Sequence, residues 1–224
     1  MESISSTRKN SKHLVLFIAL LVCTSSVQAQ EGNWFVSGKG GWATVADSYD
    51  EINYNYSSWE FSHDINYSLS YGYELDTFSV EGEYSYRRFE AERALMPSAP
   101  SPSERVINLH GYQDQHSLLI MGYWYPVKSK LVRPHVGLGA GYSRISWKNV
   151  RLDGPNDGFT DSDTVFTYKL STGLEVPLGK SSSFLMSYSY LKPDNVEVKD
   201  SNGAVGKLNK QELNIMDVGI KYYF

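Results

Sequence analysis

Few residues in this chain combine the types and the spacing that catalysis requires. The histidines are scattered, and the His-Glu-x-x-His spacing of zinc hydrolases does not occur. His116 and Ser117 are neighbours, and a histidine beside a serine can act as general base and nucleophile in hydrolysis. A histidine at the beginning of a β-strand explains the same two residues without any chemistry. We therefore expect no catalytic residue in this chain.

Metal binding is the second chemistry to consider. The segment 149–163 contains Asp153, Asp157, Asp161 and Asp163, and calcium prefers carboxylate oxygens. The spacing of a calcium-binding EF-hand loop fails, because residue 155 is proline and residue 164, where that loop needs glutamate, is threonine. The sequence therefore predicts a solvated acidic loop, with no metal site and no bound cofactor.

Charged residues that alternate with other types are the remaining candidates. Glu81 and Glu83 are two positions apart, so they lie on the same face of an extended strand. We expect five such residues to point into the interior of the fold, namely Glu81, Glu83, Lys169, Glu175 and Lys221, with Lys39, Asp64, Arg87 and Asp217 as further candidates. Buried charges must pair. The residues predict either ion pairs that close an interior or the lining of a hydrated pore.

The segments around these charges have the period of two that is typical of β-strands. Between 61 and 73, Phe61, Ile65 and Leu69 lie on one face, whereas Ser62 and Ser70 lie on the other. A helix would mix the two sets. The same alternation marks the segments 34–42, 78–87, 116–125, 134–142, 166–178, 184–190 and 216–224. The sequence thus predicts eight antiparallel strands.

The connections alternate in length along the chain. The long ones are 43–59, 90–113, 149–163 and 192–211, and the short ones are 74–77, 126–132 and 179–182. Such alternation is typical of an up-and-down membrane barrel, which has long loops outside and short turns in the periplasm. With an even number of strands, both chain ends are expected on the periplasmic side.

Alternation alone does not show which face points outward, since a soluble lipocalin-like barrel would enclose its apolar face. An eight-stranded barrel has an interior only wide enough for side chains, so small and charged residues fit inside and rows of aromatics fit outside, against lipid. Near the strand ends we expect two aromatic girdles, formed by Trp34, Tyr71, Tyr73, Trp124 and Tyr222 on the turn side and by Trp42, Tyr84, Tyr86, Tyr142 and Tyr188 on the loop side.

The N-terminal residues 1–29 have the pattern of a cleavable signal peptide. Basic residues precede an apolar run at 14–22 and a small-residue site that ends at Ala29, which leaves residues 30–224 as one barrel domain. The only cysteine, Cys23, leaves with this segment. Removing Glu2 and three basic residues leaves 18 basic and 24 acidic residues in the mature chain, so nucleic acid is not an expected partner.

Two motifs resemble those of a known family. The chain ends in alternating apolar residues with Tyr222 and the terminal Phe224, and residues 134–142 alternate glycine with larger residues. Together they resemble the small bacterial outer-membrane β-barrels that include the OmpA transmembrane domain, the opacity-type proteins and the OmpX and Ail barrels. The resemblance implies that the barrel-assembly machinery of the outer membrane recognises Tyr222 and Phe224. Unlike in full OmpA, we expect no periplasmic peptidoglycan-binding domain after the last strand, so a tether to the cell wall is not implied.

The resemblance implies a non-enzymatic barrel with a structural or adhesin-like role. Its partners would be outer-membrane lipid, lipopolysaccharide and host or other surface ligands, contacted through the four long loops. A narrow solute channel and a lipid A-modifying enzyme remain as alternatives. Outer-membrane lipid A deacylases carry a His-x-Ser-Asn run, and this chain has none.

Overall fold

A computed structural model describes residues 34–224, apart from 46–47, 53–54, 62–63, 98–103, 128, 130, 153–158, 200–204 and 210. Side chains are described at fewer positions, which leave out 48–52, 55–61, 64, 91–97, 104–110, 149–152, 159, 196–199 and 205–209. The predicted signal peptide lies outside the described residues. Residues 33–223 form one compact unit.

The described part of the chain contains twelve β-strands. They are β1 (Trp34–Val45), β2 (Ser48–Ile52), β3 (Asn55–Phe61), β4 (Asp64–Glu74), β5 (Phe78–Pro97), β6 (Glu104–Trp124), β7 (Arg133–Leu152), β8 (Phe159–Pro177), β9 (Ser182–Pro193), β10 (Val196–Lys199), β11 (Val205–Asn209) and β12 (Leu213–Tyr223).

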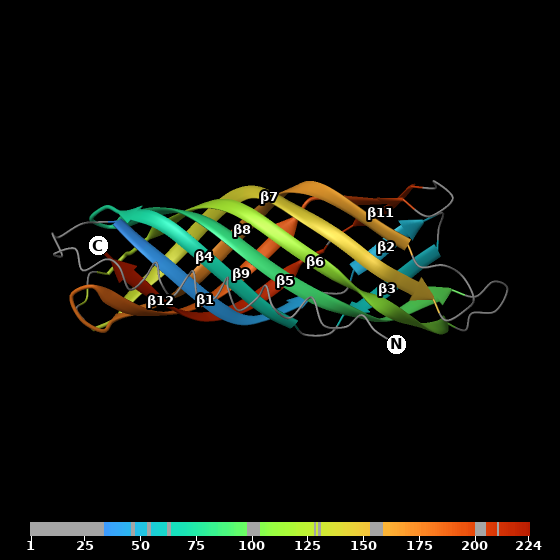
Figure 1. The fold of residues 1–224 in the computed structure, drawn as a ribbon, viewed down its shortest axis with the longest axis horizontal. Coiled ribbons are helices and arrows are strands. Elements are labelled where there is room, and N and C mark those ends of the chain that lie inside the picture. The colour runs from blue at the N-terminus through green and yellow to red at the C-terminus, as the bar shows by residue number, and fades with distance from the viewer. Residues whose placement is uncertain are drawn as a thin grey trace, which may run out of the picture. The chain divides into compact units, whose positions relative to one another are not determined.

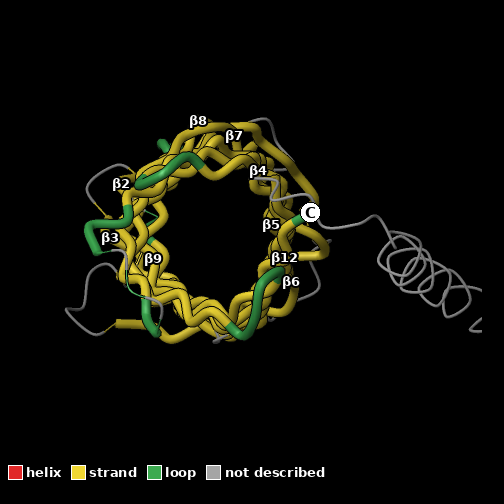
Figure 2. The backbone as a smooth tube through the Cα atoms, turned by 90° about the vertical axis from the view of Figure 1, so that its left-hand side faces the viewer, coloured by secondary structure: helices red, strands yellow, loops and turns green. Residues whose placement is uncertain are grey.

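Eight of these strands close into an antiparallel barrel, as the alternation of the sequence predicted. The strand order is β5-β4-β1-β12-β9-β8-β7-β6, and pairing of β6 with β5 completes the ring (Figures 1 and 2). The first and last strands pair directly, with Val36 opposite Tyr222. Closure leaves these eight strands without a free edge in the body of the barrel.

The long connections were predicted as loops, and this prediction was wrong for much of their length. Strands β5 and β6 cover most of 90–113, and β7 and β8 continue into 149–163. The segments 43–59 and 192–211 contain β2, β3, β10 and β11, a four-stranded ribbon that joins the barrel through pairing of β3 with β5. The predicted strand at 61–73 is divided between β3 and β4. Apolar alternation missed these parts because their apolar residues are few or stand next to each other, as at 94–96 and 106–107.

The barrel buries one face of each strand and exposes the other. On β4 and β5, Ser70 and Glu83 are buried, whereas Leu69 and Tyr84 are exposed. The same alternation continues along β6, β7, β8, β9 and β12. The small and charged face therefore forms the interior, and the large apolar face forms the outer wall.

The interior also contains large side chains, although we expected mainly small residues there. Each of several large side chains lies over a glycine of a neighbouring strand. A Cβ atom added to Gly137 would lie 2.5 Å from the Tyr123 ring, and one added to Gly72 would lie 2.6 Å from the Phe35 ring. A glycine on one strand thus makes room for a bulky residue on the next, which lets an eight-stranded barrel enclose both.

Candidate functional site

An ionic cluster occupies the end of the barrel that has the short connections. Arg133 donates to Glu74 at 2.6 Å and to Glu175 at 3.2 Å. Lys221 donates to the same two carboxylates at 2.7 and 3.4 Å. The hydroxyl of Tyr223 adds hydrogen bonds of 2.6 Å to Glu74 and 2.8 Å to Glu175. Two cations and two carboxylates thus neutralise each other, which a buried cluster requires.

A second ionic cluster lies around Glu83. Its carboxylate accepts hydrogen bonds from Lys169 at 2.7 Å and from Lys39 at 2.9 Å. The side chain of Glu83 is 0% exposed and that of Lys169 is 1% exposed. The ammonium of Lys39 also lies 3.8 Å from Glu81. Ion pairs across the interior therefore connect strands β1, β5 and β8.

A third polar layer is centred on Arg87, which is fully buried. Its guanidinium donates to Ser85 at 3.1 Å and to Ser117 at 3.3 Å. On the neighbouring strand β4, Asn66 pairs with Arg87 and donates a 2.6 Å hydrogen bond to Asp217. The carboxylate of Asp217 occupies the space over Gly41, where an added Cβ atom would lie 2.6 Å from it. The three layers together hold five cations and five carboxylates.

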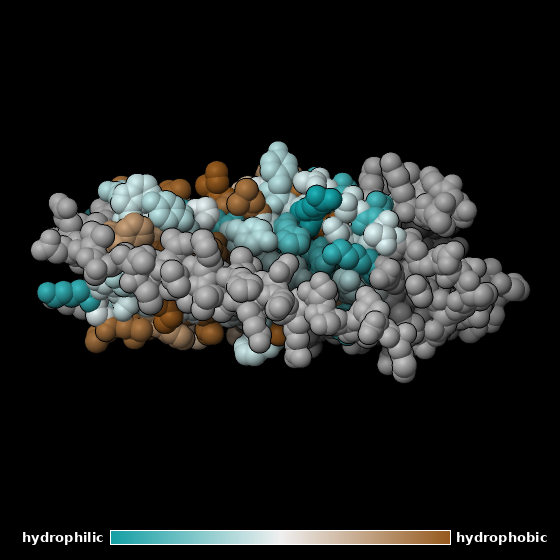
Figure 3. All heavy atoms as spheres, viewed as in Figure 1, coloured by the Kyte–Doolittle hydropathy of each residue, from teal (hydrophilic) through white to brown (hydrophobic). Residues whose placement is uncertain are grey.

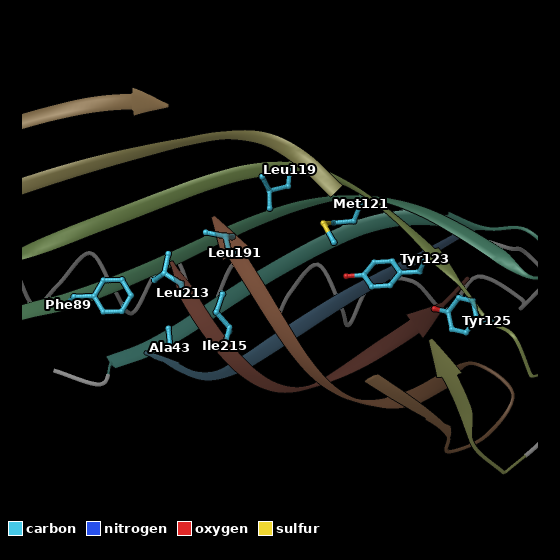
Figure 4. Close-up of a cluster of buried hydrophobic side chains, with 9 residues drawn as sticks. All are labelled: Ala43, Phe89, Leu119, Met121, Tyr123, Tyr125, Leu191, Leu213 and Ile215. Carbon is cyan, nitrogen blue, oxygen red and sulfur yellow. The ribbon is translucent and has the colours of Figure 1, made fainter. Parts of the chain in front are cut away.

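A row of apolar and aromatic side chains extends along the interior, from the hairpin side to the turn side. The cluster consists of Ala43, Phe89, Leu119, Met121, Tyr123, Tyr125, Leu191, Leu213 and Ile215, and Figure 4 shows it extended along the barrel. Phe89, Leu213 and Ile215 lie at one end of this row, and Tyr125 lies at the other. The apolar row therefore runs beside the ionic clusters, since Glu83 pairs with Leu119 and the Tyr125 hydroxyl accepts a 3.3 Å hydrogen bond from Lys221.

All five of the charged residues that the sequence singled out take part in ion pairs, and they are divided between two clusters. Glu81, Glu83 and Lys169 belong to the Glu83 cluster, whereas Glu175 and Lys221 belong to the cluster at the turns. Sequence reasoning missed Glu74 and Arg133, because they stand at strand ends, where alternation gives no signal. The side chain of Asp64 lies outside the described residues.

The outer wall is apolar over much of the barrel (Figure 3). Eight of the ten aromatic residues that we expected in the girdles are exposed, and Tyr73 and Tyr86 are partly covered. On the turn side, Trp34 stacks on Tyr71 with ring centroids 5.3 Å apart and meets the edge of Tyr73 at 4.9 Å. On the loop side, Tyr142 meets Phe166 edge to face at 5.9 Å.

A group of polar side chains lies on the outer wall next to the loop-side aromatics. Asp114 accepts hydrogen bonds from Arg88 at 2.7 Å, from Lys148 at 2.9 Å and from Tyr86 at 2.9 Å. Arg88 and Lys148 are each 45% exposed. Arg144 is also exposed, and it pairs with His116, which is two positions further along β6 than Asp114 and nearer to the apolar wall. We call Arg88, Arg144 and Lys148 the basic patch.

The structure separates the two residues that could have formed a catalytic pair. His116 is exposed on the outer wall, where its Nδ1 lies 2.8 Å from the Tyr84 hydroxyl. Ser117 points into the interior and contacts Ser143 at 2.8 Å. Because the two side chains lie on opposite faces of the strand, His116 cannot act as a base for Ser117. In the described residues there is no group of three side chains that could hold a metal ion.

No helix in the described residues has the length and apolar character needed to cross a membrane. A closed antiparallel barrel with an exposed apolar wall, rows of aromatic residues on that wall and a charged interior has the architecture of a bacterial outer-membrane protein. The loop-side aromatics were expected near strand ends, but Tyr84 and Tyr142 lie within β5 and β7, because these strands continue into the hairpins. The chain belongs to the outer membrane protein beta-barrel domain family, whose model matches residues 15–216. It is therefore a protein of the bacterial outer membrane.

Solved structures of similar fold include Neisserial surface protein A, with a TM-score of 0.54 and 14% identity over 86% of this chain and 97% of that one. The outer membrane protein OprG of Pseudomonas aeruginosa gives a TM-score of 0.57 and 14% identity over 86% and 98% of the two chains. Ail, the attachment invasion locus protein of Yersinia pestis, was crystallised with a heparin analogue and gives 0.43 and 16% over 85% and 99%. No curated protein sequence matches this chain.

Proposed function

We propose that this protein is a non-enzymatic barrel with a closed interior that presents its long hairpins as a surface for interaction. The observation that carries the proposal is the division of the molecule into a filled interior and projecting strands. Charged and apolar side chains fill the barrel, whereas β5, β6, β7 and β8 continue beyond the aromatic rows. The surface for specific contact is then on the hairpins, since the outer wall of the barrel faces lipid.

The same arrangement supports an orientation in the membrane. The short connections and the C-terminal end of β12 lie at one end of the barrel, and the long hairpins lie at the other. Outer-membrane barrels keep short turns in the periplasm and long loops outside. We propose that both ends of the barrel domain are periplasmic, and that Tyr222 and Phe224 form the signal for the assembly machinery.

A narrow solute channel is the main alternative. A channel needs a continuous hydrated path. It would give large, steady current steps in planar bilayers, and these steps would be smaller in the Glu81→Gln variant. The neutral ionic layers and the apolar cluster argue against such a path, because together they occupy the interior with side chains. A lipid A-modifying activity has less support, because His116 and Ser117 point to opposite faces.

The interaction proposal predicts that binding depends on the hairpin of β5 and β6. Because Arg93 pairs with Asn108, residues 94–107 can be replaced by an Asn-Gly turn without a change of register. A binding assay with the intact protein first identifies which host matrix proteins or surface glycolipids it binds. We expect the shortened variant to lose binding to those ligands. Heat-dependent gel mobility should remain, since the barrel body is unchanged.

The control for this experiment trims the β7–β8 hairpin instead and tests the same set of ligands. Loss of binding in only one of the two variants would locate the contact. Retained binding after all four long connections had been trimmed would refute the adhesin-like role.

We further propose that the basic patch contacts the phosphate groups of lipopolysaccharide. Arg88, Arg144 and Lys148 lie next to the loop-side aromatics, where the lipid headgroups of the outer leaflet would be. Asp114 fixes Arg88 and Lys148 in place, and the Arg88 guanidinium also lies 4.4 Å above the Tyr112 ring. Asp114 and the neighbouring Glu90 offset two of the three positive charges, so the contribution of each cation is expected to be modest.

Replacing Lys148 by glutamine is expected to weaken the binding of lipopolysaccharide about 5-fold, since one cation near an anionic lipid surface contributes about 1 kcal/mol. The measurement is titration of the folded protein in neutral detergent with lipopolysaccharide at low salt. Lys180→Gln is the matched control, because Lys180 is exposed at the turn end. Equal affinities of the two variants, or equal affinity of the intact protein for dephosphorylated lipopolysaccharide, would contradict the proposal.

A further inference from the structure

A small internal cavity lies where the two ionic clusters meet. Its volume is about 20 Å³, and the lysines of both clusters line it, Lys39 from the Glu83 cluster and Lys221 from the cluster at the turns. A cavity needs about 10–15 Å³ on this measure to hold one water molecule. The space is therefore large enough for one water molecule.

Four side chains in the lining have buried polar atoms without a hydrogen-bond partner among the described residues. The atoms are Glu81 Oε1, the Tyr123 hydroxyl, His135 Nδ1 and Ser187 Oγ. Each of these side chains belongs to a residue that is at least nine-tenths buried. They come from four strands, β5, β6, β7 and β9, which the closed barrel brings to one place. Buried polar groups are almost always paired in native proteins, so the four together indicate a ligand.

The chemistry of the four atoms matches the hydrogen bonds of one water molecule. A carboxylate oxygen accepts, and an imidazole nitrogen accepts when the ring proton is on the other nitrogen. The hydroxyls of tyrosine and serine can each donate. We propose that the cavity binds a single water molecule, which donates to Glu81 and His135 and accepts from Tyr123 and Ser187.

The charges of the lining select a neutral ligand. The two ammonium groups of Lys39 and Lys221 would repel a metal cation, and the carboxylate of Glu81 would repel a halide. The lysines already have carboxylate partners in Glu83 and Glu74, at 2.9 and 2.7 Å. A water molecule satisfies the four unpaired atoms without disturbing the charge balance of either cluster.

The water site does not depend on the proposed surface role. It has a structural consequence of its own for the barrel interior. The water connects the two ionic clusters, since Glu81 belongs to one of them and His135 lies beside Tyr125, with ring centroids 5.7 Å apart. The Tyr125 hydroxyl in turn accepts a 3.3 Å hydrogen bond from Lys221 of the other cluster. It also fixes the imidazole of His135 with its proton on Nε2.

The test is a high-resolution crystal structure of the barrel grown with bromide present. We expect an electron-density peak of water size within hydrogen-bond distance of Glu81, Tyr123, His135 and Ser187. The peak should vanish in the double variant Tyr123→Phe, Ser187→Ala. It should remain in Ser70→Ala, which removes a buried, unpaired hydroxyl that does not line this cavity. An empty cavity in the unaltered protein, or an anomalous bromide peak in it, would overturn the proposal.

A second measurement does not require any variant to fold. Nitrogen-15 spectra of the unaltered barrel in lipid nanodiscs report which ring nitrogen of His135 carries the proton. We expect Nε2 to be protonated and Nδ1 to have the shift of a hydrogen-bonded acceptor. A proton on Nδ1 would overturn the assigned arrangement.

Discussion

Replacing Glu83 by glutamine is expected to lower the free energy of unfolding by about 3–5 kcal/mol, because it leaves two buried ammonium groups without their shared counter-ion. Lys169 would lose its only carboxylate partner in the described ion pairs, and Lys39 would retain only Glu81, at 3.8 Å. Equilibrium urea unfolding in lipid vesicles, followed by tryptophan fluorescence and by gel mobility, measures this difference.

A second substitution separates lost charge balance from lost packing. Adding Lys169→Met to Glu83→Gln removes the uncompensated cation, so we expect part of the stability to return. Glu90→Gln, an exposed change on the same strand, should alter the stability by less than about 0.5 kcal/mol. Unchanged stability in Glu83→Gln alone would mean that the two lysines do not depend on this carboxylate.

Gly141→Ala is expected to have an effect of similar size for a different reason. A Cβ atom at this position would lie 2.0 Å from the Leu118 carbonyl oxygen and 2.8 Å from the Leu119 Cα atom. Both contacts are with backbone, so no side-chain rotation relieves them, and β6 and β7 must move apart. Such overpacking costs about 1–3 kcal/mol and sometimes more. Refolding yield in detergent and the unfolding midpoint in urea report the loss.

The matched control is Gly122→Ala on the same pair of strands. Gly122 faces outward, and an added Cβ atom would have its nearest neighbour, the Leu138 carbonyl oxygen, 3.9 Å away. We expect this variant to fold with unchanged or slightly increased stability, since alanine restricts the unfolded chain more than glycine does. If the two alanine variants behaved alike, the close approach at Gly141 would not limit the barrel.

The barrel and its inner face could be predicted because a half-buried strand has a period of two. Glu81, Glu83 and Lys169 alternate with exposed apolar residues, so the sequence places them on one face once the strand is recognised. Their pairing could not be predicted, because it depends on which strands lie opposite each other across the interior. Lys39 and Glu83 are 44 positions apart in the sequence, and Lys169 and Glu83 are 86 apart.

The contents of the interior were predicted only in part. The sequence shows glycines at 137, 139 and 141, which indicated a small-residue face. It does not show that Tyr123 and Met121 of the neighbouring strand occupy the space over Gly137 and Gly139. That information lies in the register between β6 and β7, in which Tyr123 pairs with Gly137. The cavity between the ionic clusters is a product of the same registers and has no local signal.

The continuation of β5 and β6 beyond the aromatic rows has a mechanical consequence. From Arg88 to Pro97 the strand pair is ten residues long, and nine steps of about 3.3 Å correspond to roughly 30 Å along the strand. A paired ribbon resists bending far better than a single chain of the same length. The far end of the described ribbon, where Pro97 pairs with Glu104, is thus supported by two paired strands whose base lies in the barrel wall. A ligand pulling on this end would load the hydrogen bonds of the ribbon together and transmit the force directly into the barrel.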